Sequence, residues 1–347
     1  MRRERCPRRA VSVDGNYDAL QADAMKQAAG PPRFSAKAER ERLEGLATLL
    51  ANAGYPNAEL EATLADPAFD RKLAEMEAQV LEGYRQTAPL GPPAGPLAGE
   101  AARRLRDEVV EAHRAGRSLA GRDLTGADLS GLDLHGATLT GALLEGARLA
   151  DADLRDADLE RAILAHADLR RATLRGARLG EANLGLAQLG GADLSGADLS
   201  GAVLYQADLT GASFRGADLT LADLSEATLR DNDLSSALAQ LLTLLRVDLA
   251  GSRLAGADLG RARLAQSLWH RARCERARFT GAALKYADFS HADVRGADFT
   301  GAALFRARFH RTRDEGAVFT GRALALGDDE PLAEAVTWQD KLRGKAG

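Results

Sequence analysis

The chain has 347 residues, of which 28% are charged and 45% hydrophobic, and its formal net charge at pH 7 is −4. This balance gives no general nucleic-acid-binding footprint, and no apolar run approaches the roughly 20 residues that a membrane span needs. The two cysteines cannot build a disulfide framework, because Cys6 lies in a polar segment and Cys274 at a position expected to be buried. We therefore expect a cytoplasmic protein without a membrane or nucleic-acid partner.

The N-terminal part of the chain predicts a tail followed by a small helical unit. Residues 1–31 are arginine-rich and then polar, with no apolar h-region of a signal peptide, and predict a disordered tail. Within residues 32–87, apolar residues recur at helical spacing over Ser35–Ala53 and Asp66–Tyr84. A few turns bury little surface, so we expect this unit to be marginal unless it packs on the rest of the chain or on a partner.

A linker and a second helical segment follow. Residues 88–98 are rich in proline and glycine and predict a semi-stiff linker. Residues 99–116 predict a helix, since Leu105, Val109 and Ala112 recur at spacings of four and three. We expect this helix to cap the segment that comes next.

Residues 117–326 repeat every five residues without an insertion or deletion. We label the centre of each repeat i; the 42 centres run from Leu119 to Leu324, and all but Ala239 and Asp314 are bulky and apolar. Position i−2 is alanine in 32 of the 42 repeats. A short fixed period predicts a stacked, quasi-one-dimensional architecture instead of a globular core with a pocket.

The period of five fits neither a helix nor a straight strand, so the backbone must bend once per repeat. Four right-angle bends close a square of twenty residues, with the centres inside and alanine at the cramped corners. Glycine is frequent at i+2, which suits a corner because glycine tolerates a positive φ. The consensus weakens between Asn232 and Val247 and at Trp269, where we expect a distorted rod or a side chain turned outward.

These repeats, such as Ala127-Asp128-Leu129-Ser130-Gly131, resemble the pentapeptide repeat proteins, whose consensus is A-(D/N)-L-x-x. The resemblance implies a mainly β fold, a right-handed quadrilateral β-helix, here with a small N-terminal α-helical unit and helical caps at both ends. Residues 327–347 begin with an acidic turn and Pro331, which predicts a C-terminal helix and tail. In the quinolone-resistance branch such a helix mediates dimerisation, which implies a homodimer for this chain.

The sequence contains no recognisable catalytic or metal-binding motif, and we expect no enzyme activity, cofactor or metal. Most acidic side chains stand at the outward position i−1, where solvation is the ordinary explanation. His270, His291 and His310 fall on one side of successive coils, but neighbouring arginines create a positive field that disfavours a cation. We interpret these histidines as a solvated polar face.

A rod without a pocket must act through its outer faces, and one of its four faces is apolar. Exposed apolar surface often marks an interaction site. Docking of the N-terminal helices, or plain support of a flat sheet, would explain the same residues. We call this surface the apolar face; besides Ala165, its members are Leu143, Ile163, Leu186, Val203, Tyr205, Leu245, Tyr286 and Phe305.

Charge is unevenly distributed along the rod. Acids exceed bases by 11 to 4 between Glu181 and Asp258, whereas bases exceed acids by 13 to 6 between Arg261 and Arg322. A basic region could meet an acidic protein or nucleic acid, although the net charge argues against the latter. The residues of this predicted basic patch are Arg271, Arg273, Arg276, Arg278, Arg308 and Arg311.

Two hypotheses of function follow. The first is a non-enzymatic scaffold or adaptor that binds a protein partner: the stretch from Ala115 to Leu134, with the preface Pro31-Pro32-Arg33-Phe34, is similar to pentapeptide repeat proteins associated with bacterial type VI secretion. Such proteins often carry an additional N-terminal domain that this sequence does not show. The second is a DNA mimic that modulates a type II topoisomerase, as in the quinolone-resistance branch. Against it, the outward charges of the repeats nearly cancel and the C-terminal part is basic.

Overall fold

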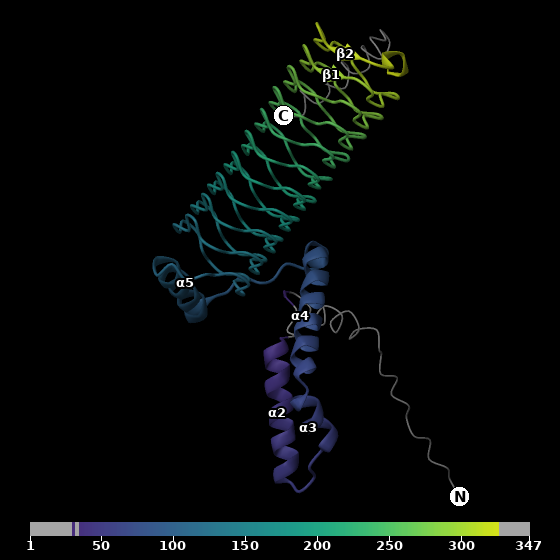
Figure 1. Ribbon diagram of the computed structural model, residues 1–347. Coiled ribbons are helices and arrows are strands. Elements are labelled where there is room, and N and C mark those ends of the chain that lie inside the picture. The colour runs from purple at the N-terminus through teal and green to yellow at the C-terminus, as the bar shows by residue number, and fades with distance from the viewer. Residues whose placement is uncertain (1–29, 32–34, 326–347) are drawn as a thin grey trace, which may run out of the picture.

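One long rod dominates the computed structural model, which describes residues 30–31 and 35–325 (Figure 1). Most of the predicted tail and the whole C-terminal helix predicted over residues 327–347 lie outside these described residues. The helices α2 to α4 form a unit that extends from the N-terminal end of the rod, and α5 lies against that end (Figure 1). No helix in the described part of the chain is long and apolar enough to cross a membrane.

The small N-terminal helical unit is present, and it has little core of its own. Its helices are α2 (Ala36–Asn52), α3 (Ala58–Ala65) and α4 (Pro67–Thr87). Each starts after a side chain that accepts a backbone N–H bond, which satisfies one otherwise orphaned donor; these caps are Ser35, Asn57 and Asp66. Within α2 to α4 as described, Leu73 alone is buried, whereas Leu49 and Met76 are exposed.

Two short elements connect this unit to the rod. The 3₁₀ helix η1 spans Ala88–Leu90, and α5 spans Gly99–Arg114. Val109 and Ala112 of α5 are buried in the same hydrophobic cluster as the rod's central leucines, and Leu105 packs against it. The helix thus places its apolar side on the end of the rod.

The rod is a solenoid in which the i−1 residue of a repeat forms a bridge with the residue twenty positions later. The bridges are parallel, from Asp123 with Leu143 to Asp293 with Arg313. The last two coils have the paired short strands β1 (Asp298–Phe299) and β2 (Val318–Phe319), followed by the 3₁₀ helix η2 (Arg322–Leu324). Twenty residues are four pentapeptides, so the predicted four-sided coil is confirmed.

Within each coil, the backbone turns at position i+2. This position has a left-handed conformation even where it is not glycine, as at Asp151 and Leu186, each with a φ of 59°. The corner is closed by a bond such as that from the Ala147 N–H to the Leu144 carbonyl, at 3.0 Å. The structure thus confirms the predicted corner and shows that hydrogen bonding between coils holds other residue types in this conformation.

The outward carboxylates at i−1 have a structural role beyond solvation. Asp123 Oδ1, for example, accepts the backbone N–H of Thr125 at 3.1 Å, and Asn183 Oδ1 accepts that of Gly185 at 2.9 Å. Such a local bond satisfies a backbone donor on the face of the coil. This explains why the consensus accepts both aspartate and asparagine.

The centres fill the interior as a continuous column of buried leucines that becomes aromatic toward the C-terminus. Parallel rings stack four repeats (one coil) apart, at 4.7 Å between Phe279 and Phe299, and rings two repeats apart meet edge to face, as expected for aromatic quadrupoles. The rings of this aromatic column are Trp269, Phe279, Phe289, Phe299, Phe309 and Phe319.

The expectation of a distorted rod or an outward side chain at the irregular repeats is wrong. Trp269 is fully buried, and the twenty-residue pairing continues through Leu238 and Leu268. At Ala239 the small centre is accompanied by the larger Leu242 at the next i−2 position, and both are buried. Because the exchange of sizes conserves interior volume, the coil keeps its register.

Candidate functional site

The apolar face is divided into a covered and an open part. At the N-terminal end, Ile163 and Ala165 form a buried cluster with Ala88 of η1, and Tyr84 and Leu143 pack against it. Ile163 is only 1% exposed. Internal docking therefore accounts for this part of the face.

The covering segment, residues 82–97, is here called the strap. Its helical half is fixed by hydrogen bonds: the Asn183 side-chain amide donates to the Arg85 carbonyl, and the Arg85 guanidinium donates to the Arg161 carbonyl at 3.1 Å. Arg161 also forms an ion pair with Glu82 at 2.7 Å. Several independent contacts therefore hold the end of α4 on the rod.

The proline-rich half of the strap also follows the rod. The Leu97 N–H donates to the Gly126 carbonyl at 2.9 Å, and the Ala94 N–H donates to Glu145 Oε1 at 3.1 Å. Pro89 lies so close to Gly185 that a Cβ added there would come within 2.7 Å of the Pro89 Cβ. The predicted linker is thus seated against the rod, and a residue without a side chain makes room for it.

Two titratable groups lie beneath the strap, of which the Glu145 carboxyl is buried and the His166 ring is half-buried. Glu145 is 1% exposed, and burial raises the pKa of its carboxyl group, an effect that the bond from the Ala94 N–H opposes. Burial lowers the pKa of His166, whereas the nearby carbonyls of Gly91 and Ala88 act in the opposite direction. The protonation of both groups is consequently coupled to docking of the strap.

The open part of the apolar face lies farther along the rod. Tyr286 and Phe305 are 48% and 44% exposed and meet edge to face, with 5.8 Å between ring centroids. Leu186, Val203, Tyr205 and Leu245 are half-buried. Nothing in the described part of the chain covers these rings, which leaves them available to a partner.

Sequence reasoning missed three exposed leucines beside this open part. Leu221 and Leu241 stack twenty residues apart at the corner that leads into the apolar face, and they are 62% and 45% exposed. Leu238, 50% exposed, stands just before the same corner. The signal available in the sequence was leucine at i+2 in two repeats twenty residues apart. Sorting the residues by face assigned this position to the adjoining side of the coil and not to the apolar face.

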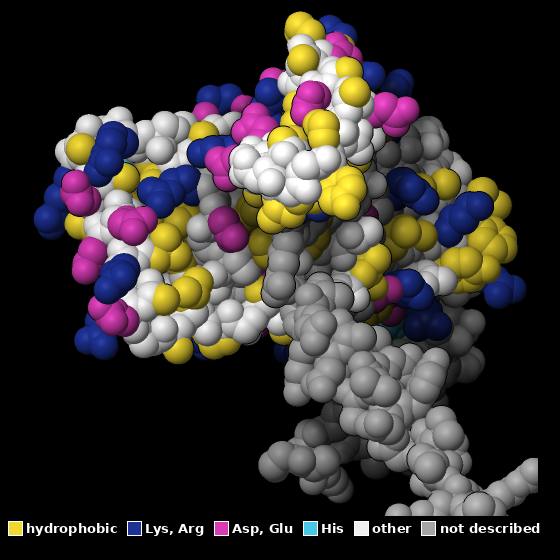
Figure 2. Space-filling view, turned by 90° about the horizontal axis from the view of Figure 1, so that it is seen from below, with side chains coloured by type: hydrophobic (Ala, Val, Ile, Leu, Met, Phe, Trp, Pro, Cys, Tyr) yellow, Lys and Arg dark blue, Asp and Glu magenta, His cyan; other side chains and the backbone are white. Residues whose placement is uncertain are grey.

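The predicted basic patch does not form one surface, because its six arginines lie on several sides of the coil. Arg278 pairs with Asp258 at 3.3 Å and Arg308 with Asp288 at 3.6 Å. Figure 2 shows the mixture of both charge signs and apolar side chains on the visible face, seen from below. The six arginines therefore do not act as one continuous basic surface.

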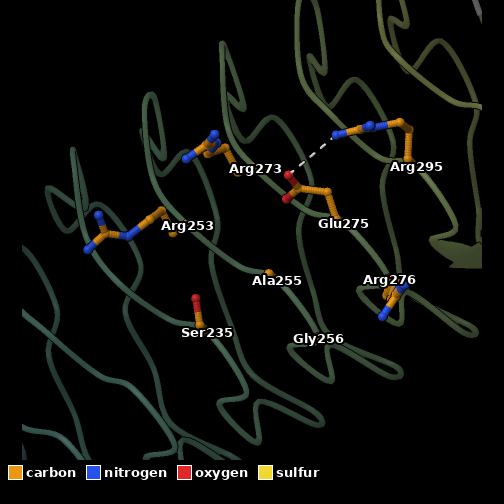
Figure 3. A pocket seen from close by; sticks show the side chains of 8 residues that line it. All are labelled: Ser235, Arg253, Ala255, Gly256, Arg273, Glu275, Arg276 and Arg295. Atoms are coloured by element: carbon orange, nitrogen blue, oxygen red, sulfur yellow. Dashed lines mark ion pairs between the residues drawn. The ribbon is translucent and has the colours of Figure 1, made fainter.

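Arg273 and Arg276 lie in a groove of about 680 Å³ on the side whose centres include Leu254 and Cys274 (Figure 3). The groove forms because Ser235, Ala255 and Gly256, on two successive coils, have small side chains or none, whereas long arginine side chains surround them. Its lining consists of Ser235, Arg253, Ala255, Gly256, Arg273, Glu275, Arg276 and Arg295.

The histidines come close to one another but do not form a metal site in the structure. The rings of His291 and His310 meet edge to face at 5.7 Å, and His270 Nε2 is 3.8 Å from Asp288 Oδ2. Burial, followed by His310 and nearby positive groups, lowers the pKa of His291. The described residues contain no group of three or more histidine, cysteine, aspartate or glutamate side chains arranged to hold a metal ion.

The twenty-residue ladder, the left-handed corners and the filled column define a four-sided β-solenoid built from pentapeptides. The family described as pentapeptide repeats matches in eight copies, in segments that together span residues 118–238 and 257–321. The chain belongs to the pentapeptide repeat family.

Solved structures of this family are also similar to the chain. HetL, a pentapeptide repeat protein involved in heterocyst differentiation regulation from the cyanobacterium Nostoc sp. strain PCC 7120, is 30% identical; the match covers 64% of this chain and 93% of HetL, with a TM-score of 0.45. Full-length QnrB1, a plasmid-mediated fluoroquinolone resistance protein, is 15% identical; the match covers 61% of this chain and 96% of QnrB1, with a TM-score of 0.36. No curated protein matches the chain.

Proposed function

We propose that this protein is a non-enzymatic scaffold that binds a protein partner through the open part of its apolar face. The observation that carries the proposal is the contrast between the two parts of that face. Where the strap lies, Ile163 is buried; where it does not, Tyr286 and Phe305 expose nearly half of their surface. Aromatic residues are enriched at protein interfaces, and exposed apolar surface is a common mark of them.

The rod suits this role because its shape is fixed by its backbone. We infer a right-handed β-helix whose N-terminal end is closed by α5, so that the exposed edge of the first coil does not pair with other chains. The outer side chains can then vary without loss of fold. A cytoplasmic role accessory to type VI secretion, in loading or assembly, remains the specific form of the scaffold that we propose.

DNA mimicry is the second candidate, and the charge distribution favours it less. A mimic of duplex DNA needs a continuous negative surface. Here arginines line a groove in the C-terminal half, and many aspartates are paired with arginines, as Asp168 is with Arg170 at 2.6 Å. Inhibition or protection of gyrase in a supercoiling assay would reverse this preference.

The scaffold is tested by charging its open face. Tyr286→Asp with Phe305→Asp should leave the rod folded, since Asp151 already occupies a left-handed corner equivalent to that of Tyr286, and the Phe305 side chain is exposed. Proteins that co-purify with the wild-type chain from producing cells should be lost, and if the bound partner is a second copy, the dimer should dissociate in sedimentation analysis.

The matched control is Gln188→Asp with Thr228→Asp, which adds the same charge at exposed i−1 positions on another face. This control should keep the association. Retained association in the Tyr286 and Phe305 variant, or equal loss in both variants, contradicts the proposal.

A further inference from the structure

We infer that the arginine-lined groove of Figure 3 binds a short acidic segment of a protein partner. The inference rests on the proposed scaffold function and adds a second contact site on a different side of the rod. It depends on the charges, shape and lining of the groove.

The groove contains more positive charge than its carboxylates neutralise. Arg253 is paired with Asp233 at 3.1 Å, and Arg295 with Asp293 at 2.7 Å and with Glu275, inside the groove, at 3.8 Å. In contrast, Arg273 and Arg276 have no carboxylate within ion-pair distance among the described residues. Two guanidinium groups therefore keep their donors for a ligand.

The chemistry of these donors selects an oxyanion. A guanidinium presents its N–H groups in a planar fork that matches the two oxygens of a carboxylate. Figure 3 shows the four arginine side chains standing around the backbone at Ala255 and Gly256, where no long side chain fills the space. A ligand can thus lie on the backbone of the coil and meet arginines on both sides.

The dimensions suit an extended polypeptide. The lining runs from Ser235 to Arg295 across three coil intervals, which at the usual strand separation is roughly 14 Å. An extended chain covers that distance with about four residues. Arginines from successive coils can then bind carboxylates on neighbouring residues of one acidic segment.

The lining disfavours nucleic acid. Proteins that bind single strands stack bases on aromatic rings, and none of the eight lining residues is aromatic. Glu275 stands inside the groove, where it would repel a continuous phosphate backbone, and the chain as a whole carries a net charge of −4. Spaced carboxylates on a peptide avoid this repulsion.

The test measures binding of a fluorescein-labelled eight-residue peptide of alternating glutamate and glycine to the full-length protein by fluorescence anisotropy. We expect saturable binding that weakens with salt, and no binding of the corresponding glutamine peptide. Arg273→Ala with Arg276→Ala should weaken binding by about tenfold or more, because two charge-assisted contacts are lost. Both arginines are exposed, so circular dichroism and thermal unfolding should be unchanged.

The matched control is Arg261→Ala with Arg263→Ala, two exposed arginines that likewise have no ion pair among the described residues but lie outside the groove. This variant should bind the peptide within about twofold of wild type. Equal weakening in both variants overturns the inference, and so does binding of the glutamine peptide. Displacement of the peptide by a short DNA duplex that binds more tightly also overturns it.

The outcomes separate this inference from the scaffold proposal. The peptide assay leaves Tyr286 and Phe305 unchanged and requires no identified partner. If peptide binding fails while charging the apolar face still abolishes association, the groove inference alone is wrong. If the peptide binds as expected but charging the apolar face has no effect, the apolar face is not the docking surface.

Discussion

The indole N–H of Trp269 donates to the hydroxyl oxygen of Ser267 at 2.6 Å, in the interior of the rod. The same hydroxyl donates to the Leu264 carbonyl at 2.6 Å. Ser267 occupies the i−2 position, where most repeats have alanine, and it is fully buried. The oversized ring at one centre is therefore accommodated by a polar exception two residues earlier.

Ser267→Ala should destabilise the rod, because the Trp269 N–H would be left buried without an acceptor. We expect a loss of about 1–3 kcal/mol, the usual cost of an unsatisfied buried donor. Urea denaturation followed by circular dichroism measures this as a lower midpoint. Ser200→Ala, at an outward position, is the control and should change the midpoint little. Equal midpoints for the two variants would show that the bond contributes nothing.

Gly185→Ala should displace the strap while leaving the rod intact. A Cβ at this position would overlap Pro89, whereas the rod around Gly185 offers no backbone obstacle. We expect faster proteolysis within residues 88–98 and faster hydrogen exchange of the Leu97 amide, which donates to Gly126. Gly190→Ala is the control, since its nearest neighbour would be 3.8 Å away. An unchanged cleavage rate would contradict the docked position of η1.

Docking of the strap should weaken as pH rises, through Glu145. Below its ordinary pKa of 4.5 the carboxyl group is neutral in both the docked and the undocked states, and burial has no electrostatic cost. Above that pH the undocked group ionises first, and docking becomes less favourable until the raised pKa of the docked state is passed.

Glu145→Gln removes this ionisation and retains an acceptor for the Ala94 N–H. Protection of the strap from proteolysis should then be equal in the variant and the wild type near pH 4 and greater in the variant at neutral pH. Comparison of the two proteins cancels the contribution of His166, which has the opposite sign: its lowered pKa makes docking costly as pH falls below 6.5. If the difference in protection between the variant and the wild type is the same at pH 4 and at neutral pH, the pH dependence does not come from Glu145.

Cys274 should be unreactive in the folded protein. It is fully buried in the column, and burial strongly raises the pKa of its thiol, with Glu275 and Asp293 acting in the same direction. In a Cys6→Ser background, iodoacetamide at mildly alkaline pH should label the protein only after unfolding, because the thiolate is the nucleophile. Rapid labelling of the native protein would mean that the column is open to solvent.

The sequence was sufficient to predict the four-sided rod because one apolar residue every five positions admits few other backbone paths. The small helical unit was also predictable from helical spacing and capping residues. The burial of Trp269 could not be predicted, because it depends on two hydrogen bonds of the Ser267 hydroxyl inside the coil, one with the Trp269 N–H and one with the Leu264 carbonyl.

The candidate sites were less predictable than the fold. The apolar face could be assigned from the register, but its division depends on contacts such as Asn183 with Arg85, ninety-eight positions apart in the chain. The charge of the groove depends on which arginines form ion pairs with carboxylates on adjacent coils. Arg278 pairs with Asp258, whereas Arg273 forms no ion pair within the described residues. The sequence assigned both arginines to the same basic patch.

The central claim is that the strap occupies one part of the apolar face and a partner occupies the other. A photo-crosslinking amino acid placed at Ile163 and, separately, at Tyr286 in producing cells tests this most directly. We predict an internal crosslink to residues 82–97 from position 163 and a crosslink to another polypeptide from position 286. Capture of another polypeptide at position 163, or only unlinked protein at position 286, would contradict the account.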